Sequence, residues 1–169
     1  GCSTIICAEK FKTSKYLEIL YELAPELMYC EPGKLTSARL PDLKHVIRMG
    51  DDVSPGMVNF NQLTRSLDPY DREKLIQVSL NLVPSDVINI QFTSGTTGVP
   101  KGATLSHHNI LNNGLLVAEA MKLTCDDKLC IPLPLYHCFG MVLGNLVCIA
   151  KGAAAVFPSE SFEPLSCLQ

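Results

Sequence analysis

Apolar and polar residues alternate along the chain with two periods, and each period predicts a different secondary structure. Apolar side chains at every second position mark strands, whereas a spacing of three or four marks helices. Residues 3–7 are expected to form a short buried strand. Further strands are expected over 27–29, 45–49, 87–92, 102–105, 128–133 and 153–157. Helices are expected over 60–67, 71–81, 106–122 and 141–151, with another beginning near 162–165.

The ends of several helices are marked by the residues that commonly cap them. Thr13 or Ser14 is expected to cap a first helix, which Pro25 stops. Ser106 is expected to cap the helix that follows the strand 102–105. Gly152 is expected to end the helix over 141–151. The buried stripe predicted for the helix over 106–122 consists of Ile110, Leu111, Gly114, Leu115, Ala118 and Met121.

Strands alternate with helices along the sequence, and this order predicts an α/β domain with a largely parallel sheet flanked by helices. The 169 residues suffice for one domain with its own core. Apolar residues make up 47% and charged residues 18%, a composition typical of a globular chain. The net charge is −3 and the chain has no basic run, which argues against a nucleic-acid partner.

No apolar stretch is long enough to span a membrane, which takes about 20 residues. Eight cysteines are present without a C-x-x-C pair or zinc-ligand spacing, so we expect no metal site formed by cysteines. Several of them lie in apolar runs, such as Cys7, Cys130 and Cys148, where a thiol packs as a small apolar group. We expect them to be reduced thiols in a reducing compartment.

One loop carries the most specific chemistry in the sequence. Glycines let backbone N–H groups approach an anion, hydroxyls donate to phosphate oxygens, and a lysine adds a positive charge. Glycines at 95, 98 and 102 are all expected to serve this approach. The loop is therefore predicted to bind phosphate. Its residues are Thr93, Ser94, Gly95, Thr96, Thr97, Gly98, Val99, Pro100 and Lys101.

The loop differs from the Walker A pattern G-x-x-x-x-G-K-[ST]. Pro100 stands in place of the second glycine, and Gly102 in place of the Ser or Thr that binds Mg²⁺. The residues after the loop read as a strand, and a helix begins only near Ser106. We therefore expect the loop to join two strands.

A second segment, Pro134-Leu135-Tyr136-His137-Cys138-Phe139-Gly140, follows the strand over 128–133. Its position, beyond the carboxyl end of a strand, is where α/β proteins usually bind ligands. Taken alone, a histidine there is more often structural than functional. His107 and His108 do not share a helical face and are also interpreted as structural.

The run from Thr93 to Gly102 resembles the signature loop of the adenylate-forming superfamily, which includes acyl-CoA synthetases, luciferases and adenylation domains. The P-(L/F)-x-H-x-x-G pattern of the same superfamily matches residues 134–140. Flanking segments, such as 89–92 and 102–107, most resemble medium-chain mitochondrial acyl-CoA synthetases. The resemblance implies that the chain is part of the large N-terminal domain of such an enzyme.

The resemblance also implies the reaction and the site. A fatty-acid carboxylate would attack ATP to give an acyl-adenylate and pyrophosphate, and the thiol of CoA would then displace AMP. The loop would hold the ATP phosphates with Mg²⁺. His137 would be the catalytic residue beside the carboxylate, and Phe139 and Gly140 would line the acyl site.

By this resemblance, residues 1–169 would be an internal fragment of the AMP-binding domain. The C-terminal lid domain would not be part of the fragment. We therefore expect the fragment alone to be inactive. It implies a mitochondrial matrix location, with a cytoplasmic one as the alternative. Three other functions stay open. These are a non-catalytic nucleotide-binding module, a ligase for a different carboxylate, and a structural protein that keeps only the fold.

Overall fold

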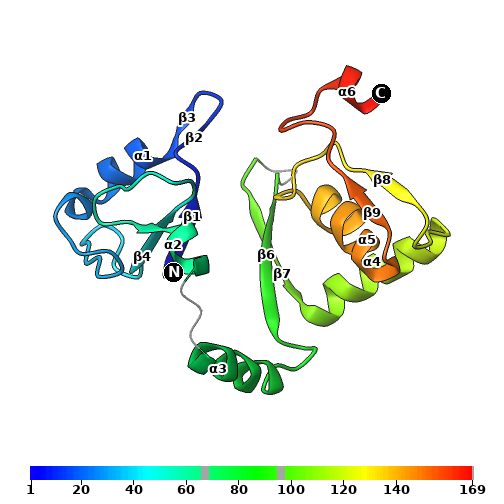
Figure 1. Cartoon of the computed structure of the whole chain (residues 1–169), viewed down its shortest axis with the longest axis horizontal. Helices are drawn as coiled ribbons and strands as arrows, with labels where there is room; N and C mark the ends of the chain where they lie inside the picture. The colour runs from blue at the N-terminus through cyan, green and yellow to red at the C-terminus, as the bar shows by residue number, and fades with distance from the viewer. Residues whose placement is uncertain (66–68, 95–97, 169) are drawn as a thin grey trace. The chain divides into compact units, whose positions relative to one another are not determined.

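The computed structural model describes residues 1–65, 69–94 and 98–168, and it divides into two compact units, Gly1–Ser79 and Leu80–Gln169 (Figure 1). Each unit combines strands with helices, so the α/β class is confirmed. Strands pair in parallel in one sheet of each unit and antiparallel in the two hairpins.

The first unit contains a three-stranded parallel sheet in the order β1-β4-β5. Its strands are β1 (Thr4–Cys7), β4 (His45–Arg48) and β5 (Val58–Asn59). The strand predicted over 45–49 is confirmed. The expectation that residues 3–7 are buried is wrong, because β1 is an edge strand that turns only Ile5 and Cys7 inward and leaves Ile6 55% exposed.

Helix α1 (Tyr16–Leu23) covers the core of the first unit with Leu17 and Leu20. The predicted cap is wrong, since Lys15 is the N-cap and makes no side-chain capping bond. Ser14 is instead part of a short antiparallel hairpin, in which β2 (Lys10–Phe11) pairs with β3 (Ser14–Lys15). The helix therefore begins only after the hairpin ends.

The strand predicted over 27–29 is also wrong, because the segment forms a 3₁₀ helix, η1 (Pro25–Met28). Proline is well suited to the first position of a helix, since its φ is already fixed near the helical value. The turn places Leu27, which is fully buried, in the core of the unit. The core residues are Leu17, Leu20, Ala24, Leu27, Leu35, Leu43, Val46 and Met57.

Helices α2 (Phe60–Arg65) and α3 (Pro69–Leu80) follow, as predicted, with residues 66–68 outside the described ranges. The apolar face of α3 is exposed in this structure, with Leu75 at 66% and Val78 at 51%.

The second unit begins with an antiparallel hairpin of β6 (Val87–Thr93) and β7 (Lys101–Ser106). Helix α4 (His107–Ala120) starts immediately after β7 and is capped by Ser106, as predicted. Asn109 completes a capping box with Ser106. Of the predicted stripe, Ile110, Gly114 and Ala118 are buried, whereas Leu111 is 56% exposed.

Strands β8 (Lys128–Cys130) and β9 (Ala154–Val156) pair in parallel. Between them run a π-helix, η2 (Phe139–Leu146), and helix α5 (Val147–Lys151), which pack beside α4 (Figure 1). Gly152 ends α5 with φ +71°, the left-handed conformation expected of a glycine cap. A short α6 (Pro164–Leu168) follows.

All eight cysteines lie in the described ranges and are free thiols. Cys148 is buried, and this burial raises the pKa of its thiol. Cys7 is half-buried and Cys130 is exposed, so only Cys148 fully fits the prediction of a thiol packed as an apolar group.

Candidate functional site

The predicted phosphate loop joins two antiparallel strands, which confirms the strand–loop–strand arrangement. The pairing runs without interruption from Asn89 opposite Leu105 to Thr93 opposite Lys101. The first and last residues of the loop therefore face each other across the end of the hairpin. Gly95, Thr96 and Thr97 lie outside the described residues, and their predicted contacts with phosphate stay a prediction.

The described residues of the loop face outward. Thr93, Ser94, Gly98, Val99, Pro100 and Lys101 are all exposed. The Thr93 hydroxyl donates a long hydrogen bond of 3.5 Å to the carbonyl of Lys101. Among the described residues Lys101 forms no ion pair, so its ammonium group is available to an anion.

Gly98 has φ +81°, a left-handed conformation in which a residue with a side chain is strained. No atom lies within 4 Å of the position that a Cβ would occupy at Gly98. The glycine is therefore needed for the turn of the chain, and the space beside it is open. An anion could approach the backbone from this side.

Gly102 has a packing role that the sequence analysis did not predict, whereas its predicted role in approach to an anion stays a prediction. A Cβ at this position would lie 3.1 Å from Cγ2 of Ile90 and 3.5 Å from Cε1 of Phe92. Phe92 is the direct partner of Gly102 across the hairpin, and its ring covers the glycine. The missing side chain thus makes room for apolar side chains of β6.

His137 lies in a tight turn between β8 and η2. Its backbone N–H donates to the carbonyl of Pro134 at 3.1 Å, and its own carbonyl accepts from the N–H of Met141 at 3.0 Å. The ring nitrogen Nδ1 accepts from the backbone N–H of Phe139 at 3.1 Å. The side chain is exposed, so Nε2 is free to meet a ligand.

Phe139 and Gly140 begin the π-helix after this turn. Phe139 is 48% exposed, whereas Gly140 is buried. A Cβ at Gly140 would lie 2.7 Å from the carbonyl oxygen of Leu133 and would also collide with the carbonyl of Pro134. The glycine is thus explained by the close approach of η2 to the backbone before the turn, a role that the sequence pattern does not reveal.

The two motifs are connected by a residue that belongs to neither. The side-chain amide of Gln91 donates a hydrogen bond of 3.0 Å to the carbonyl of Tyr136, the residue before His137. Within the described residues no hydrogen bond runs directly from His137 to the loop over 93–101. Sequence reasoning missed Gln91, because nothing in the pattern pairs two positions so far apart along the chain.

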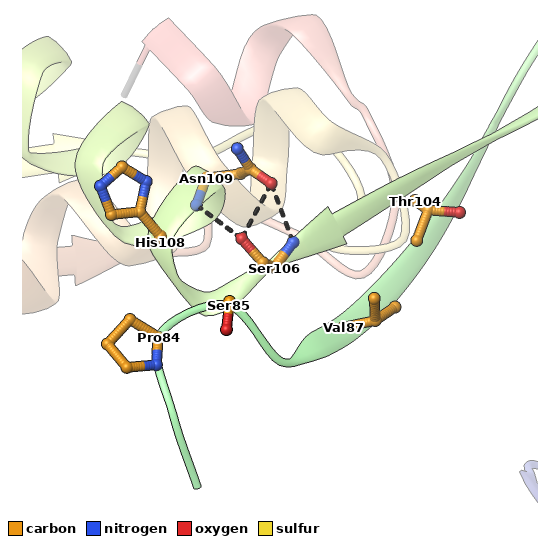
Figure 2. A pocket seen from close by; sticks show the side chains of 7 residues that line it. All are labelled: Pro84, Ser85, Val87, Thr104, Ser106, His108 and Asn109. Atoms are coloured by element: carbon orange, nitrogen blue, oxygen red, sulfur yellow. Dashed lines mark hydrogen bonds between the residues drawn. The ribbon is translucent and has the colours of Figure 1, made fainter.

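An open hollow of about 530 Å³ lies at the start of α4, and Figure 2 shows the side chains that line it. It combines apolar and polar side chains, and the first backbone N–H groups of α4 already have partners within the described residues. The N–H of His107 bonds the carbonyl of Asp86, that of His108 bonds Pro84, and that of Asn109 bonds the Ser106 hydroxyl. The bonds of His107 and His108 fix the start of the helix to the segment before β6, and the structural interpretation of the two side chains stays a prediction.

Among the described residues, no group of three histidine, cysteine or acidic side chains could hold a metal ion. The same part of the chain contains no helix of the length and apolarity needed to cross a membrane.

The fold resembles that of solved CoA ligases. The crystal structure of the anthranilate CoA ligase AuaEII, in complex with anthranoyl-AMP, superposes with a TM-score of 0.66. It covers 92% of this chain and 26% of the ligase, at 20% sequence identity, and therefore supports the fold alone. The chain thus shares the α/β fold of this part of the ligase.

Sequence similarity identifies the family. The profile of the AMP-binding enzyme family matches residues 6–168, and the chain belongs to this family. The medium-chain acyl-CoA ligase ACSF2, mitochondrial, of Danio rerio is 40% identical over 96% of this chain. The putative acyl-CoA synthetase YngI of Bacillus subtilis is 40% identical over 99% of it. The chain spans 27% and 30% of the length of these two relatives.

Proposed function

We propose that this chain is part of an AMP-forming acid–thiol ligase that activates a medium-chain fatty acid with ATP and transfers it to CoA. The observation that carries the proposal is the hydrogen bond between Gln91 and Tyr136, which joins the strand before the phosphate loop to the turn of His137. One side of the hairpin could thus hold the ATP phosphates while the turn holds the acid. Family membership and the names of the relatives support the same reaction.

The first step in the proposal is attack of the fatty-acid carboxylate on the α-phosphorus of ATP. A bond forms between a carboxylate oxygen and phosphorus, and pyrophosphate leaves. Both reactants are anions, so catalysis depends on holding them in line and neutralising their charge. In the second step the CoA thiol loses its proton to solvent, and its sulfur forms a bond with the acyl carbon. The bond between the acyl carbon and the phosphate oxygen breaks, and AMP leaves.

Lys101 and the loop donors bind the phosphates in this proposal. The ammonium group of Lys101 is exposed at the start of β7, opposite Thr93. Neutral donors come from loop hydroxyls and from loop backbone N–H groups. The hydroxyls are those of Thr93, Ser94, Thr96 and Thr97, and the backbone groups are those around Gly95, Gly98 and Val99. Pro100 stiffens the turn before the lysine. Mg²⁺ prefers oxygen ligands and commonly binds through substrate phosphates, where it neutralises charge. Mg²⁺ bound in this way needs no group of three metal-binding side chains among the described residues.

His137 orients the carboxylate. Its Nδ1 already accepts the N–H of Phe139, so the neutral ring carries its proton on Nε2. An exposed Nε2–H is a suitable donor for one carboxylate oxygen. Phe139, which is half-exposed beside it, offers an apolar surface for the acyl chain, and Gly140 holds the helix that carries this ring against the turn.

The chain is proposed to be an internal part of the larger AMP-binding domain, with a lid domain elsewhere in the protein. Ile88, Ile90 and Phe92 on β6 are 46%, 59% and 67% exposed, an apolar face that further chain would cover. The mitochondrial matrix is the proposed location, supported by the names of the relatives.

The test is ATP–pyrophosphate exchange by the full-length protein with octanoate, followed by CoA thioester formation. Octanoate-dependent exchange supports the proposal. Exchange with benzoate or an amino acid, but not with octanoate, would assign the site to a different carboxylate. ATP binding in calorimetry without any exchange would indicate a non-catalytic nucleotide-binding module, and no response to ATP a structural protein.

A further inference from the structure

We infer that Gln91 is a positioning residue that sets the alignment between the phosphate loop and His137. This inference rests on the proposed function. The carboxamide of Gln91 bonds the carbonyl of Tyr136 across 45 positions of sequence. Within the described residues it is the side-chain hydrogen bond that ties β6 to the turn of His137.

The bond starts from a rigid part of the hairpin. Gln91 is paired with Ala103 in the middle of the uninterrupted register, and its side chain is half-buried. Side chains on a strand alternate between its two faces, so Gln91 and Thr93 point to the same face of β6. Two residues of a strand span about 7 Å, so the loop begins close to the point where Gln91 holds the turn.

The opposite face of the strand has a separate task. Ile90 and Phe92 point there and cover Gly102, as the close distances to its missing Cβ show. Gln91 is therefore a polar residue between two apolar neighbours, Ile90 and Phe92, which pack within the hairpin. Its donor is directed to the turn and not to β7.

The other hydrogen bonds described for the turn join residues within it or next to it, whereas the Gln91 bond comes from a distant strand. The carbonyl of Pro134 accepts from the N–H of His137, and this bond closes the turn without fixing where it lies. The carbonyl of Tyr136 accepts from Gln91, and this bond fixes the position of the turn relative to β6. His137 is the next residue, so a shift at Tyr136 moves the imidazole.

Formation of the acyl-adenylate requires a carboxylate oxygen about 3 to 3.5 Å from phosphorus and in line with the leaving group, and a misplacement of 1 Å can lower the rate about 100-fold. Thioester formation starts from an acyl-adenylate in which the acid and the phosphate are already covalently joined. Loss of the Gln91 bond should therefore slow the first step and leave the second nearly unchanged. A purely structural role would affect both steps alike.

The experiment compares Gln91→Leu, Gln91→Glu and the full-length parent in octanoate-dependent pyrophosphate exchange and in single-turnover thioester formation from preformed octanoyl-adenylate. Leucine removes the donor, whereas glutamate keeps the shape and places an acceptor against the Tyr136 carbonyl. The matched control is Gln62→Leu, an exposed glutamine of α2. We expect both Gln91 variants to lose about 10- to 100-fold in kcat of adenylation. Thioester formation and the Gln62 variant should stay within about twofold of the parent, as expected without misalignment.

Adenylation by both Gln91 variants within twofold of an active parent would overturn the positioning role and leave the proposed function intact. Equal losses in both steps would also overturn it, since they indicate a structural role. If Gln91→Leu does not fold, the nearly isosteric Gln91→Glu decides the question by the same two rates. An inactive parent would overturn the proposed function and this inference together.

Discussion

Nδ1 of His137 accepts a hydrogen bond of 3.1 Å from the backbone N–H of Phe139. A nitrogen that accepts carries no proton, so the neutral ring has its proton on Nε2. The backbone of η2 thereby decides which ring atom is a donor. This relationship gives His137 a defined chemical role in the proposed site, that of a donor to a carboxylate.

We expect His137→Ala to lower the rate of adenylation in the full-length protein by about 100-fold, because one preorganised donor is lost. Thioester formation should fall much less. Glutamine retains an N–H donor, so His137→Gln should keep more adenylation activity than the alanine variant. Single-turnover kinetics of the two steps measure both effects, and a greater loss in thioester formation would assign His137 to another role.

Lys101 is exposed at the end of the hairpin and makes no ion pair with the described residues. We expect Lys101→Ala to lower octanoate-dependent pyrophosphate exchange by about 10²- to 10³-fold, since a charge aimed at the phosphates is removed. Lys128→Ala, an exposed lysine of β8, is the control. Exchange within a few-fold of the parent would show that the loop does not depend on this charge.

Gly140 has no space for a side chain, because a Cβ would lie 2.7 Å from the Leu133 carbonyl oxygen. We expect Gly140→Ala to lower the free energy of unfolding by about 2 to 3 kcal/mol, as overpacking against rigid backbone does. At Gly98 a Cβ would meet no neighbour, so Gly98→Ala should cost only about 1 kcal/mol of backbone strain. Urea unfolding measures both values, and equal losses would contradict the contact seen at Gly140.

Arg48 is buried, but the two carboxylates that it pairs with are not. Its Nη2 lies 2.6 Å from Glu9 Oε2 and 2.9 Å from Asp52 Oδ2, while the side chains of Glu9 and Asp52 are 58% and 80% exposed. Removing the arginine leaves two carboxylates that water can solvate. Removing both carboxylates leaves a buried, unpaired cation.

We therefore expect the double variant Glu9→Ala and Asp52→Ala to be destabilised by about 3 kcal/mol or more, and Arg48→Met by only about 1 to 2 kcal/mol. Denaturant unfolding of the three proteins tests the order. Glu18→Ala, an exposed acid that pairs with the exposed Lys15, is the control and should change stability by less than about 0.5 kcal/mol. The reverse order would show that burial of Arg48 carries no penalty.

Asp127 predicts a pH dependence of stability. Its Oδ2 accepts from the backbone N–H of Thr124 at 2.7 Å and from the Thr124 hydroxyl at 2.8 Å, and these bonds hold the pKa of the carboxyl below its ordinary value. The stabilisation by these bonds is therefore present at pH values above the pKa of the carboxyl in the unfolded chain, which is about 4. It is lost as the pH falls through the lower pKa of the carboxyl in the folded protein.

We expect Asp127→Ala to lower the Tm at pH 7, with a difference from the parent that narrows as the pH falls below about 4. Asp126→Ala is the control, because the side chain of Asp126 makes no such pair of bonds within the described ranges. Thermal scans from pH 7 to pH 3 give the comparison. A difference that stays constant over this range would mean that the charge of Asp127 does not stabilise the turn.

Local features of the chain could be predicted wherever the residues that cause them are close in sequence. Three local features are enough to predict a strand–loop–strand unit. They are the β-branched run before the loop, the glycines within the loop and the polar start of the next segment. Ser106 and Gly152 mark the two helix ends that they cap, because capping involves only residues a few positions apart. The proposed site can likewise be predicted from local sequence, since the loop that would bind phosphate is continuous.

The tertiary structure alone decided features for which the local sequence allows two conformations, and features that join distant residues. Ser14 could cap a helix, but pairing with Phe11 places it in a hairpin. Leu27 reads as part of a strand, but Pro25 and the core make it part of a 3₁₀ turn. Two contacts could not be predicted from the residue types that make them. One is the hydrogen bond between Gln91 and Tyr136, and the other is the contact of Gly140 with Leu133. Local conformation is thus determined by neighbouring residues, whereas alignment of the two motifs depends on the packing of segments far apart in the chain.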